Sequence, residues 1–356
     1  MENLVIDESF WNGRRVFLTG HTGFKGSWLS LWLHRLGADV IGYSLESPTN
    51  PSIFKDANVS TILERDIYGN VCNTTDLSKA MQDSAPEIVI HMAAQSIVRK
   101  SYDFPYETLN TNIMGTVSLF EAVRKTPSVK AVLNVTSDKC YENIETEKAY
   151  EENSPMGGYD PYSSSKGCSE LISSAYRKSF FNSEGIALAT VRAGNVIGGG
   201  DWASNRIIPD AIRAFMSNKK LEIRSPLSIR PWQHVLEPLS GYLKLCENMM
   251  EHPKKYSQGW NFGPDDNNVQ SVSNLVSILG NYWGEGAQWI ESKDLHPHEA
   301  KILKLDSSKA KLELEWSPRW NLEIALHETV MWYKEWQNGK NVISFSLNQI
   351  KKYETQ

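Results

Sequence analysis

The sequence predicts an α/β protein built on a doubly wound parallel sheet, and two observations predict this fold. First, residues 15–43 alternate between short apolar runs and a helical pattern, with a glycine-rich turn after the first run. Second, the later apolar runs at 88–92, 131–136 and 186–192 contain few polar residues, as strands buried on both faces of a parallel sheet require. Parallel neighbours need crossover connections, and helical patterns fill the intervening segments.

The first predicted unit is a strand, a turn, a helix and a second strand. The apolar run at 16–18 is the expected first strand, and the glycine-rich segment 20–26 follows it. A helix with leucines on one face is predicted up to Gly37, because glycine commonly ends a helix. The second strand is expected at 39–43, and the three later runs supply further strands of the same sheet.

The character of the sequence changes after Arg192, where glycine, proline and tryptophan become frequent. We therefore predict a dinucleotide-binding domain over residues 1–192. A smaller α/β domain, mainly for the substrate, is predicted over residues 193–356, with an approximate boundary that the chain is free to cross. The tail from Asn338 onward is polar and is predicted to be a surface appendage.

Composition and charge exclude several classes of protein. The chain has 37 Lys plus Arg against 42 Asp plus Glu, a net charge of -5, and no block of like charge. This predicts no nucleic-acid partner and no membrane surface. The four cysteines show no disulfide or zinc spacing, and the acidic N-terminus does not resemble a signal peptide. No long uncharged apolar run occurs, so we expect a cytoplasmic protein.

The glycine-rich turn, GHTGFKG, predicts a dinucleotide site. Gly20 permits the tight turn, Gly23 lets the backbone approach a pyrophosphate, and Gly26 allows close contact between helix and strand. At the end of the second strand, Ser44 or Glu46 is the candidate partner of the adenosine ribose. Because no Arg or Lys lies there to bind a 2′-phosphate, the sequence favours NAD over NADP.

A second motif supplies candidate catalytic residues. Tyr162 and Lys166 have the YxxxK spacing, which places both side chains on one face of a helix. The ammonium group is expected to lower the pKa of the tyrosine, so that the phenolate takes a hydroxyl proton. The segment Ser137, Asp138 and Lys139 ends the strand at 131–136, at the sheet edge where ligands of open α/β sheets bind.

Six motifs between Trp11 and Trp336 extend this pattern: GHTGFKG, HMAAQS, TSDKCYEN, YDPYSSSKG, RAGNVIGGGDW and IRPWQHVLEP. Together they resemble the extended short-chain dehydrogenase/reductase family, and within it the nucleotide-sugar 4,6-dehydratases. An acidic residue directly after the active-site serine is typical of the dehydratases, and TSDKCY with IRPWQHVLEP is typical of their CDP-glucose branch. The resemblance implies a Rossmann-type fold, NAD, and conversion of CDP-glucose to CDP-4-keto-6-deoxyglucose for deoxysugars of bacterial surface polysaccharide such as lipopolysaccharide O-antigen.

The resemblance also implies catalytic roles. Tyr162 takes the C4 hydroxyl proton, Lys166 lowers the pKa of Tyr162 and holds the nicotinamide ribose, and Ser137 bonds the C4 oxygen. Asp138 protonates the departing C6 hydroxyl. Lys139 stands where the dTDP-glucose and GDP-mannose relatives carry a glutamate that removes the C5 proton, and it can serve as base only when neutral. The alternative for Lys139 is a structural pairing with Asp138.

The family's binding residues are carried over position by position. The expected cofactor contacts are Gly20, Thr22, Gly23, Phe24, Lys25, Gly26, Ser44, Asn70, Val71, Ala93, Ala94, Gln95, Asn112, Tyr162 and Lys166. Asn70 replaces an aspartate that meets adenine in relatives. The expected substrate contacts are Asn195, Arg206, Arg230, His234 and His298. Arginine suits the diphosphate oxygens, and His298 is assigned to the nucleotide edge.

Three further expectations complete the prediction. The cluster His296 to Glu299 has no third partner at ligand spacing, so we predict no metal site. The family implies a homodimer or homotetramer. A nucleotide-sugar 4-epimerase shares the serine, tyrosine and lysine but has no use for Asp138, and a non-catalytic dinucleotide sensor has no use for Tyr162 and Lys166. Both remain alternatives.

Overall fold

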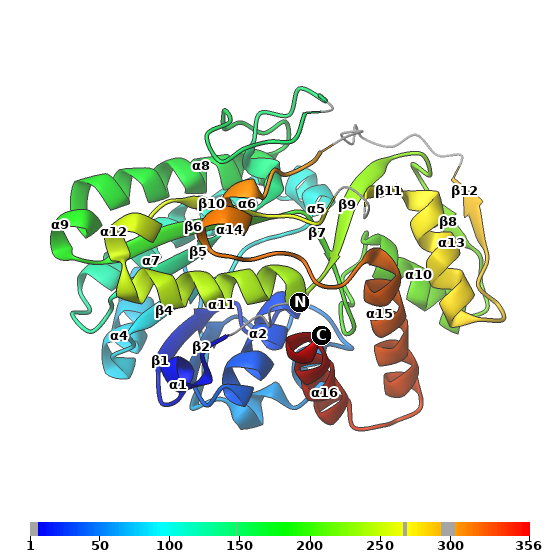
Figure 1. The fold of residues 1–356 in the computed structure, drawn as a ribbon, viewed down its shortest axis with the longest axis horizontal. Coiled ribbons are helices and arrows are strands. Elements are labelled where there is room, and N and C mark those ends of the chain that lie inside the picture. Colours follow the sequence, from blue (N-terminus) through cyan, green and yellow to red (C-terminus); the bar gives the residue numbers. More distant parts are fainter. Residues whose placement is uncertain (1–5, 147, 266–268, 293–302) are drawn as a thin grey trace.

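The computed structural model describes residues 6–146, 148–265, 269–292 and 303–356. Its centre is a seven-stranded parallel sheet in the order β10-β6-β5-β4-β1-β2-β3 (Figure 1). These strands are β1 Arg15–Thr19, β2 Asp39–Ser44, β3 Arg65–Tyr68, β4 Ile88–His91, β5 Ala131–Val135, β6 Ala187–Ala193 and β10 Gly259–Phe262. The strand order reverses between β1 and β4, and ligands of such sheets bind at that point.

Helices cover both faces of this sheet and form two separate apolar layers. One layer joins the sheet to α4 (Thr74–Ser84), α7 (Gly115–Arg124) and the end of α8 (Pro161–Tyr176). The other joins it to α2 (Phe24–Arg35) and α11 (Leu236–Glu251). The predicted doubly wound parallel sheet is therefore confirmed, and the predicted strands agree with β1, β2, β4, β5 and β6 to within a residue or two.

Short helical segments connect these elements. They are α1 Glu8–Trp11, α3 Ile53–Asp56, η1 Val59–Ile62, α5 Val98–Asp103, α6 Pro105–Leu109, η2 Asn110–Met114, η3 Asp138–Cys140, η4 Arg177–Phe181, α9 Asn182–Glu184 and α12 Pro253–Tyr256. The turn η3 follows β5 directly and carries two of the predicted catalytic residues. Because α6, η2 and α8 contact one another, the segment after β4 lies beside the YxxxK helix.

The C-terminal half forms two small sheets beside the main one (Figure 1). The first contains β7 Asn195–Ile197, β9 Ile229–His234 and β11 Val269–Ser271, and the second pairs β8 Leu221–Ile223 with β12 Trp289–Glu291. The accompanying helices are α10 Ile207–Met216, α13 Val272–Trp283, α14 Ser308–Glu313 and α15 Leu322–Gln337. Between β9 and β11 in the sequence, the chain returns to the main sheet to form β10.

The last helix, α16 (Val342–Thr355), corrects the expectation that the tail is a surface appendage. It packs against α2, and the side chains of Ile350 and Tyr353 are fully buried. The indole of Trp32 on α2 donates a hydrogen bond to Glu354 over 2.8 Å. The expectation failed because the buried face of α16 mixes polar and apolar residues, which hides its helical period in the sequence.

Among the described residues, no helix is long and apolar enough to span a membrane. Within the same part of the chain, His, Cys, Asp and Glu form no group of three suited to a metal ion. The sequence analysis predicted that the cluster from His296 to Glu299 binds no metal, and these residues lie outside the described part of the chain.

Candidate active site

The glycine-rich turn joins β1 to α2 and leaves room only for backbone. Gly20 has a φ of +78°, and a Cβ atom there would lie 2.7 Å from the backbone nitrogen of Ala93. A Cβ on Gly26 would overlap the carbonyl oxygen of Gly20. Gly23 caps α2 without any side-chain hydrogen bond, so the first N–H groups of the helix are left for another acceptor. The turn therefore fits a dinucleotide pyrophosphate.

The ends of β2 and β3 lie next to this turn. The hydroxyls of Ser44 and Thr22 are 2.9 Å apart and Ser44 is buried, whereas Glu46 is exposed. Asn70 is exposed after β3, and its side-chain oxygen accepts a hydrogen bond from the backbone of Cys72. These positions lie at the carboxyl edge of the sheet, where the predicted ribose and adenine contacts belong.

The segment after β4 is tied to the YxxxK helix by Asn112. The Asn112 side chain accepts from the backbone N–H of Gln95 over 2.9 Å and donates to Ser165 on α8 over 2.8 Å. The side-chain amide of Gln95 is already engaged by Thr108. The Asn112 amide also donates to the Gln95 carbonyl over 3.0 Å, so both the backbone and the side chain of Gln95 are held by neighbouring residues. The backbone of Ala93 lies against the glycine-rich turn.

Ser137, Asp138 and Lys139 follow β5 as a compact polar turn. The Ser137 hydroxyl donates to Asp138 Oδ1 over 2.9 Å and accepts from the backbone N–H of Lys139 over 3.2 Å. The Lys139 ammonium lies 3.4 Å from the same carboxylate oxygen. Ser137 and Asp138 are buried and Lys139 is partly exposed. A buried carboxyl group thus faces the site with two hydrogen-bonding neighbours.

Tyr162 and Lys166 stand on α8 opposite this turn, and both are buried. Burial raises the pKa of Tyr162 to about 12, while hydrogen bonding by Ser137 and the positive charge of Arg206 act to lower it. Burial also lowers the pKa of Lys166 to about 8. The Lys166 ammonium donates a hydrogen bond to the Val135 carbonyl over 3.2 Å.

A buried ion pair holds α8 against the sheet. Arg192 on β6 donates two hydrogen bonds to Glu170 on α8, over 2.7 and 2.8 Å. Thr190 on β6 donates a third over 2.7 Å. Glu170 lies one helical turn after Lys166, so this contact fixes the position of the YxxxK face relative to the ends of β5 and β6.

Arg206 reaches this site from the C-terminal half. Its guanidinium donates to Asp201 over 3.0 Å and to Ser96, just after β4, over 3.1 Å. Burial lowers the pKa of Lys25, at the start of α2, to about 7, and the nearby charges of Arg206 and Lys166 contribute to this lowering. Arg206 and Lys25 thus bring basic groups to the neighbourhood of Tyr162 and Asp138, as a site for an anionic sugar nucleotide requires.

The remaining predicted substrate residues are less closely grouped. Asn195 begins β7 and pairs with Trp232, and Arg230 is half-buried on the neighbouring strand β9. His298 lies outside the described residues. His234 is a correction: it is fully buried, with its ring 4.8 Å from Trp320 and 6.0 Å from Trp28, so no face remains for a substrate. Its position at the end of β9 directs it into the core.

Sequence reasoning missed two neighbours of the site. Asp201 in the GGGDW motif orients Arg206, and its charge next to a glycine run was a usable signal. Tyr242 on α11 is fully buried, and the Lys25 ammonium lies 5.8 Å from the centre of its ring. Burial raises the pKa of Tyr242, and the nearby charges of Tyr162 and Asp138 raise it further. No local motif marks Tyr242, because only the packing of α11 on the sheet brings it there.

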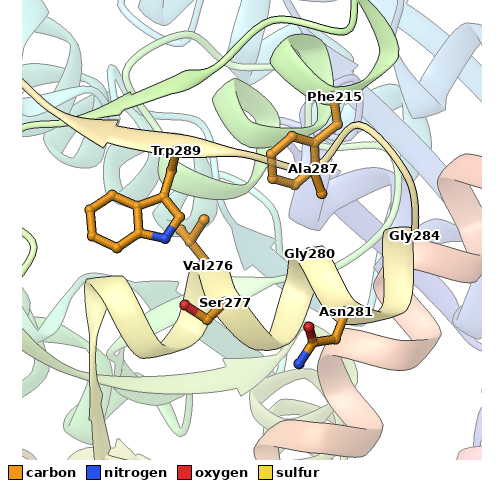
Figure 2. Close-up of a pocket in the computed structure, with 8 residues that line it drawn as sticks. All are labelled: Phe215, Val276, Ser277, Gly280, Asn281, Gly284, Ala287 and Trp289. Carbon is orange, nitrogen blue, oxygen red and sulfur yellow. The ribbon is translucent and has the colours of Figure 1, made fainter.

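A hollow elsewhere on the molecule is not part of this site. Figure 2 shows it between α13 and β12, lined by Phe215, Val276, Ser277, Gly280, Asn281, Gly284, Ala287 and Trp289. None of these side chains is ionisable, and none belongs to the motifs described above. The chemistry is assigned to the side chains gathered at the carboxyl ends of β1, β4 and β5.

The fold and this group of side chains define a short-chain dehydrogenase/reductase of the extended type, with an acidic residue next to its active-site serine. The model of the GDP-mannose 4,6 dehydratase family matches residues 17–329. The chain therefore belongs to this family, and the resemblance found in its motifs is confirmed.

Individual relatives narrow the comparison. The chain is 52% identical to the CDP-glucose 4,6-dehydratase of Salmonella typhimurium strain LT2, over 98% of both proteins. It is 26% identical to a probable dTDP-glucose 4,6-dehydratase of Sinorhizobium fredii, over 90% of this chain and 93% of the relative.

Solved structures share the fold. The dTDP-glucose 4,6-dehydratase of Streptomyces venezuelae, with NAD and TYD bound, gives a TM-score of 0.78 at 21% identity and covers 92% of this chain and 99% of its own. The UDP-glucose 4-epimerase of Thermotoga maritima, with UDP-glucose, gives a TM-score of 0.78 at 20% identity. It covers 91% of this chain and 99% of its own. Because the dehydratase and the epimerase share this fold equally well, the fold does not distinguish the two activities, and only the side chains of the site can do so.

Proposed function

We propose that this protein is an NAD-dependent hydro-lyase that converts CDP-glucose to CDP-4-keto-6-deoxyglucose and water. The observation that carries the proposal is Asp138, a buried carboxyl group hydrogen-bonded to Ser137 and facing Tyr162. Water elimination needs an acid at this place, whereas 4-epimerisation does not. The full-length relative at 52% identity, a CDP-glucose 4,6-dehydratase, supports the same substrate.

NAD fits the residues around the glycine-rich turn. The turn excludes side chains at Gly20 and Gly26, and the uncapped start of α2 offers N–H groups to phosphate oxygens. Ser44 with Thr22, and Asn70, are the proposed neighbours of the ribose and adenine. When bound, NAD accepts the hydrogen of C4 with its electron pair and returns it to C6.

The first chemical task belongs to Tyr162 and its neighbours. The Tyr162 phenolate takes the proton of the C4 hydroxyl, and the Ser137 hydroxyl bonds the C4 oxygen. Lys166, held by the Val135 carbonyl, binds the nicotinamide ribose. Because burial raises the pKa of Tyr162, the phenolate forms only when positive charge accumulates around it, which Arg206 and the bound cofactor supply.

The second task belongs to Asp138 and Lys139. Once C4 is a ketone, the C5 proton is acidic, and Lys139 removes it while Asp138 protonates the departing C6 hydroxyl. After its protons exchange with solvent, Lys139 returns a proton to C5. The 3.4 Å contact between the Lys139 ammonium and Asp138 supports a shared site of action, although it is also the contact of a structural pair.

Substrate binding falls to the C-terminal half in this proposal. Residues 193–356 supply the sugar-nucleotide side of the cleft and residues 1–192 the cofactor side. Arg206 binds the diphosphate, since it reaches the segment after β4 and carries a charge that Asp201 orients. Asn195 and Arg230 extend this side of the cleft.

The test is a pair of isotope experiments read by mass spectrometry. C4-deuterated CDP-glucose in ordinary water should give product with deuterium at C6, and unlabelled substrate in heavy water should give product with deuterium at C5. Loss of the C4 label to solvent, or no solvent deuterium at C5, would contradict the dehydratase. A product that is only the C4 epimer would establish the epimerase, and no product at all would favour the dinucleotide sensor.

Three broader features belong to the same proposal. The enzyme works in the cytoplasm, in the synthesis of deoxysugars for surface polysaccharide. It is a homodimer or homotetramer joined through α8, where Leu171 is 61% exposed. The adjoining segments α6 and η2 carry the exposed Tyr106 and Met114. Light scattering on the purified protein tests the assembly, and Leu171→Glu should shift it toward the monomer.

A further inference from the structure

The turn that carries Asp138 and Lys139 has little internal support. The backbone N–H of Cys140 donates to the Ser137 carbonyl over 3.2 Å, and the Ser137 hydroxyl accepts from the backbone N–H of Lys139 over the same distance. A 3₁₀ turn of three residues has poor hydrogen-bond geometry and does not by itself fix its position relative to a neighbouring helix. That position must come from contacts on either side of the turn.

Before the turn, two contacts tie the chain to α8. The Lys166 ammonium donates to the carbonyl of Val135 over 3.2 Å. The Thr136 hydroxyl donates to Glu170 over 2.5 Å, and both of these side chains are buried. The next residue, Ser137, is therefore held against the YxxxK helix.

After the turn, the anchor is the hydroxyl of Tyr141. This side chain is 1% exposed, and its hydroxyl accepts from the Arg192 guanidinium over 2.6 Å and donates to Asn261 over 2.7 Å. Arg192 also donates to Glu170 over 2.7 and 2.8 Å. Through Arg192, Tyr141 thus reaches the same carboxylate that Thr136 bonds before the turn. Both ends of the turn are fastened to one buried ion pair.

The end of the turn also packs directly on α8. A Cβ atom on Gly167 of α8 would lie 2.7 Å from the carbonyl oxygen of Gly157 and 3.3 Å from that of Cys140. The backbone N–H of Gly157 donates to the same Cys140 carbonyl over 2.9 Å. No side chain separates the turn from the helix at this point, so a shift of the Tyr141 anchor moves the turn relative to the helix.

We propose that Tyr141 is a positioning residue that acts on water elimination rather than on C4 oxidation. Its hydroxyl, fastened to the ion pair of Arg192 and Glu170, keeps the turn at a fixed position relative to the YxxxK helix. The inference rests on the proposed function, in which Asp138 and Lys139 of that turn act on C6 and C5.

The order of the anchors along the chain explains why the two steps separate. Ser137 and Tyr162 act on C4, and Ser137 directly follows the anchored Thr136. Lys139 lies two residues before Tyr141, at the other end of the turn. Loss of the second anchor therefore frees the end that carries the elimination groups and leaves the C4 end held. A misplacement of about 1 Å at reacting groups can cost about a hundredfold in rate.

The test compares formation and decay of the reduced cofactor in a single turnover, with NAD-loaded enzyme in excess over CDP-glucose. Formation reports C4 oxidation, and decay reports elimination with C6 reduction. Tyr141→Phe should leave the rate of formation within about twofold of wild type and slow the decay by at least about tenfold. The ratio of the two rates is measured on active molecules only, so it does not depend on how much of the variant folds.

Tyr150→Phe is the matched control. Tyr150 stacks on Tyr141 with ring centres 5.3 Å apart, and its hydroxyl donates to Asn143 rather than to the ion pair. This variant loses a hydroxyl from the same apolar cluster and should keep the wild-type ratio of rates. Arg192→Lys keeps a charge beside Glu170 but lacks the fork that bonds two partners, so it should slow the decay selectively. Adding Tyr141→Phe to it should have little further effect.

The outcomes separate the positioning role from the proposed function. Wild-type protein that forms no 4-keto-6-deoxy product overturns the proposed function and the inference with it. When wild-type protein forms this product, a Tyr141→Phe variant whose decay is slowed no more than its formation overturns the positioning role alone. The same selective slowing in Tyr150→Phe also overturns it, because loosening of the cluster would then be sufficient.

Discussion

The ammonium group of Lys166 donates a hydrogen bond to the carbonyl oxygen of Val135, the last residue of β5, over 3.2 Å. This contact ties the YxxxK helix to the strand that leads into Ser137 and Asp138. The lysine is thereby held at the sheet edge. Burial raises the pKa of Tyr162, and the charge of Arg206, from the other half of the chain, is one of the groups that act to lower it.

Tyr162→Phe should reduce product formation from CDP-glucose by at least about a hundredfold, because the base of the first step is lost. Nucleotide binding, measured by calorimetry with CDP, should change little, since phenylalanine keeps the ring. Tyr159→Phe is the matched control: Tyr159 is 82% exposed three residues earlier, and its variant should keep wild-type activity. Turnover of Tyr162→Phe near the wild-type rate would remove Tyr162 from the mechanism.

Asp138→Asn should stop the reaction after C4 oxidation, because an amide cannot protonate the departing C6 hydroxyl. The near-ultraviolet absorbance of reduced cofactor should then accumulate on mixing with CDP-glucose and persist. Wild-type protein under the same conditions should show this absorbance only transiently. An Asp138→Asn variant that releases 4-keto-6-deoxy product at the wild-type rate would assign the acid elsewhere.

Lys139→Ala should slow exchange of the C5 hydrogen with heavy water more than it slows C4 oxidation, because the variant keeps Tyr162 and loses the second base. Both rates are measured in one time course: absorbance of the reduced cofactor follows C4 oxidation, and mass spectrometry of quenched samples follows C5 exchange. Lys148→Ala, which removes an exposed lysine, serves as control. Equal slowing of both steps by Lys139→Ala would leave Lys139 as the structural partner of Asp138.

Arg206→Ala should move the rise of kcat with pH to higher pH. Burial already raises the pKa of Tyr162, and loss of the Arg206 charge removes one of the groups that oppose this rise. The same variant should weaken CDP-glucose binding by about 2 kcal/mol through loss of charge-assisted hydrogen bonds. Arg206→Lys keeps the charge and should shift the pH profile less. An unshifted profile in Arg206→Ala would show that the guanidinium does not act on Tyr162.

Glu237→Gln should change how stability depends on pH. Burial raises the pKa of Glu237 from 4.5 to about 7, so folding favours its protonated form. Its stabilising contribution is complete below pH 4.5 and is lost as the pH rises through 7. Urea unfolding from pH 4.5 to 8 should therefore show a smaller loss of free energy in Glu237→Gln than in wild type. Glu251→Gln, at an exposed position on the same helix, should follow wild type.

The parts of the site that were predicted from sequence are those encoded within one short segment. The turn from Gly20 to Gly26, the Ser137 to Lys139 turn and the Tyr162 helix each follow or precede a strand with a clear apolar run. In a parallel sheet the carboxyl ends of strands share one edge, so local motifs of this kind meet without further information.

The parts that were missed depend on packing between distant segments. His234 has the same hydrogen-bonding groups whether it faces a ligand or the core, and only the position of Trp28 and Trp320 decides between them. Tyr242 reaches the site because α11 crosses the sheet. The apolar period of α16 is interrupted by buried polar residues that find partners on other helices, such as Gln349 with Glu328.

The packing of α16 on α2 has a consequence for how the protein is made. Trp32, next to the cofactor turn in sequence, bonds to Glu354, which follows it by 322 residues. During synthesis on the ribosome, that face of α2 stays exposed to water until nearly all of the described chain has emerged. The helix that begins at the glycine-rich turn therefore reaches its final environment only after α16 has been synthesised.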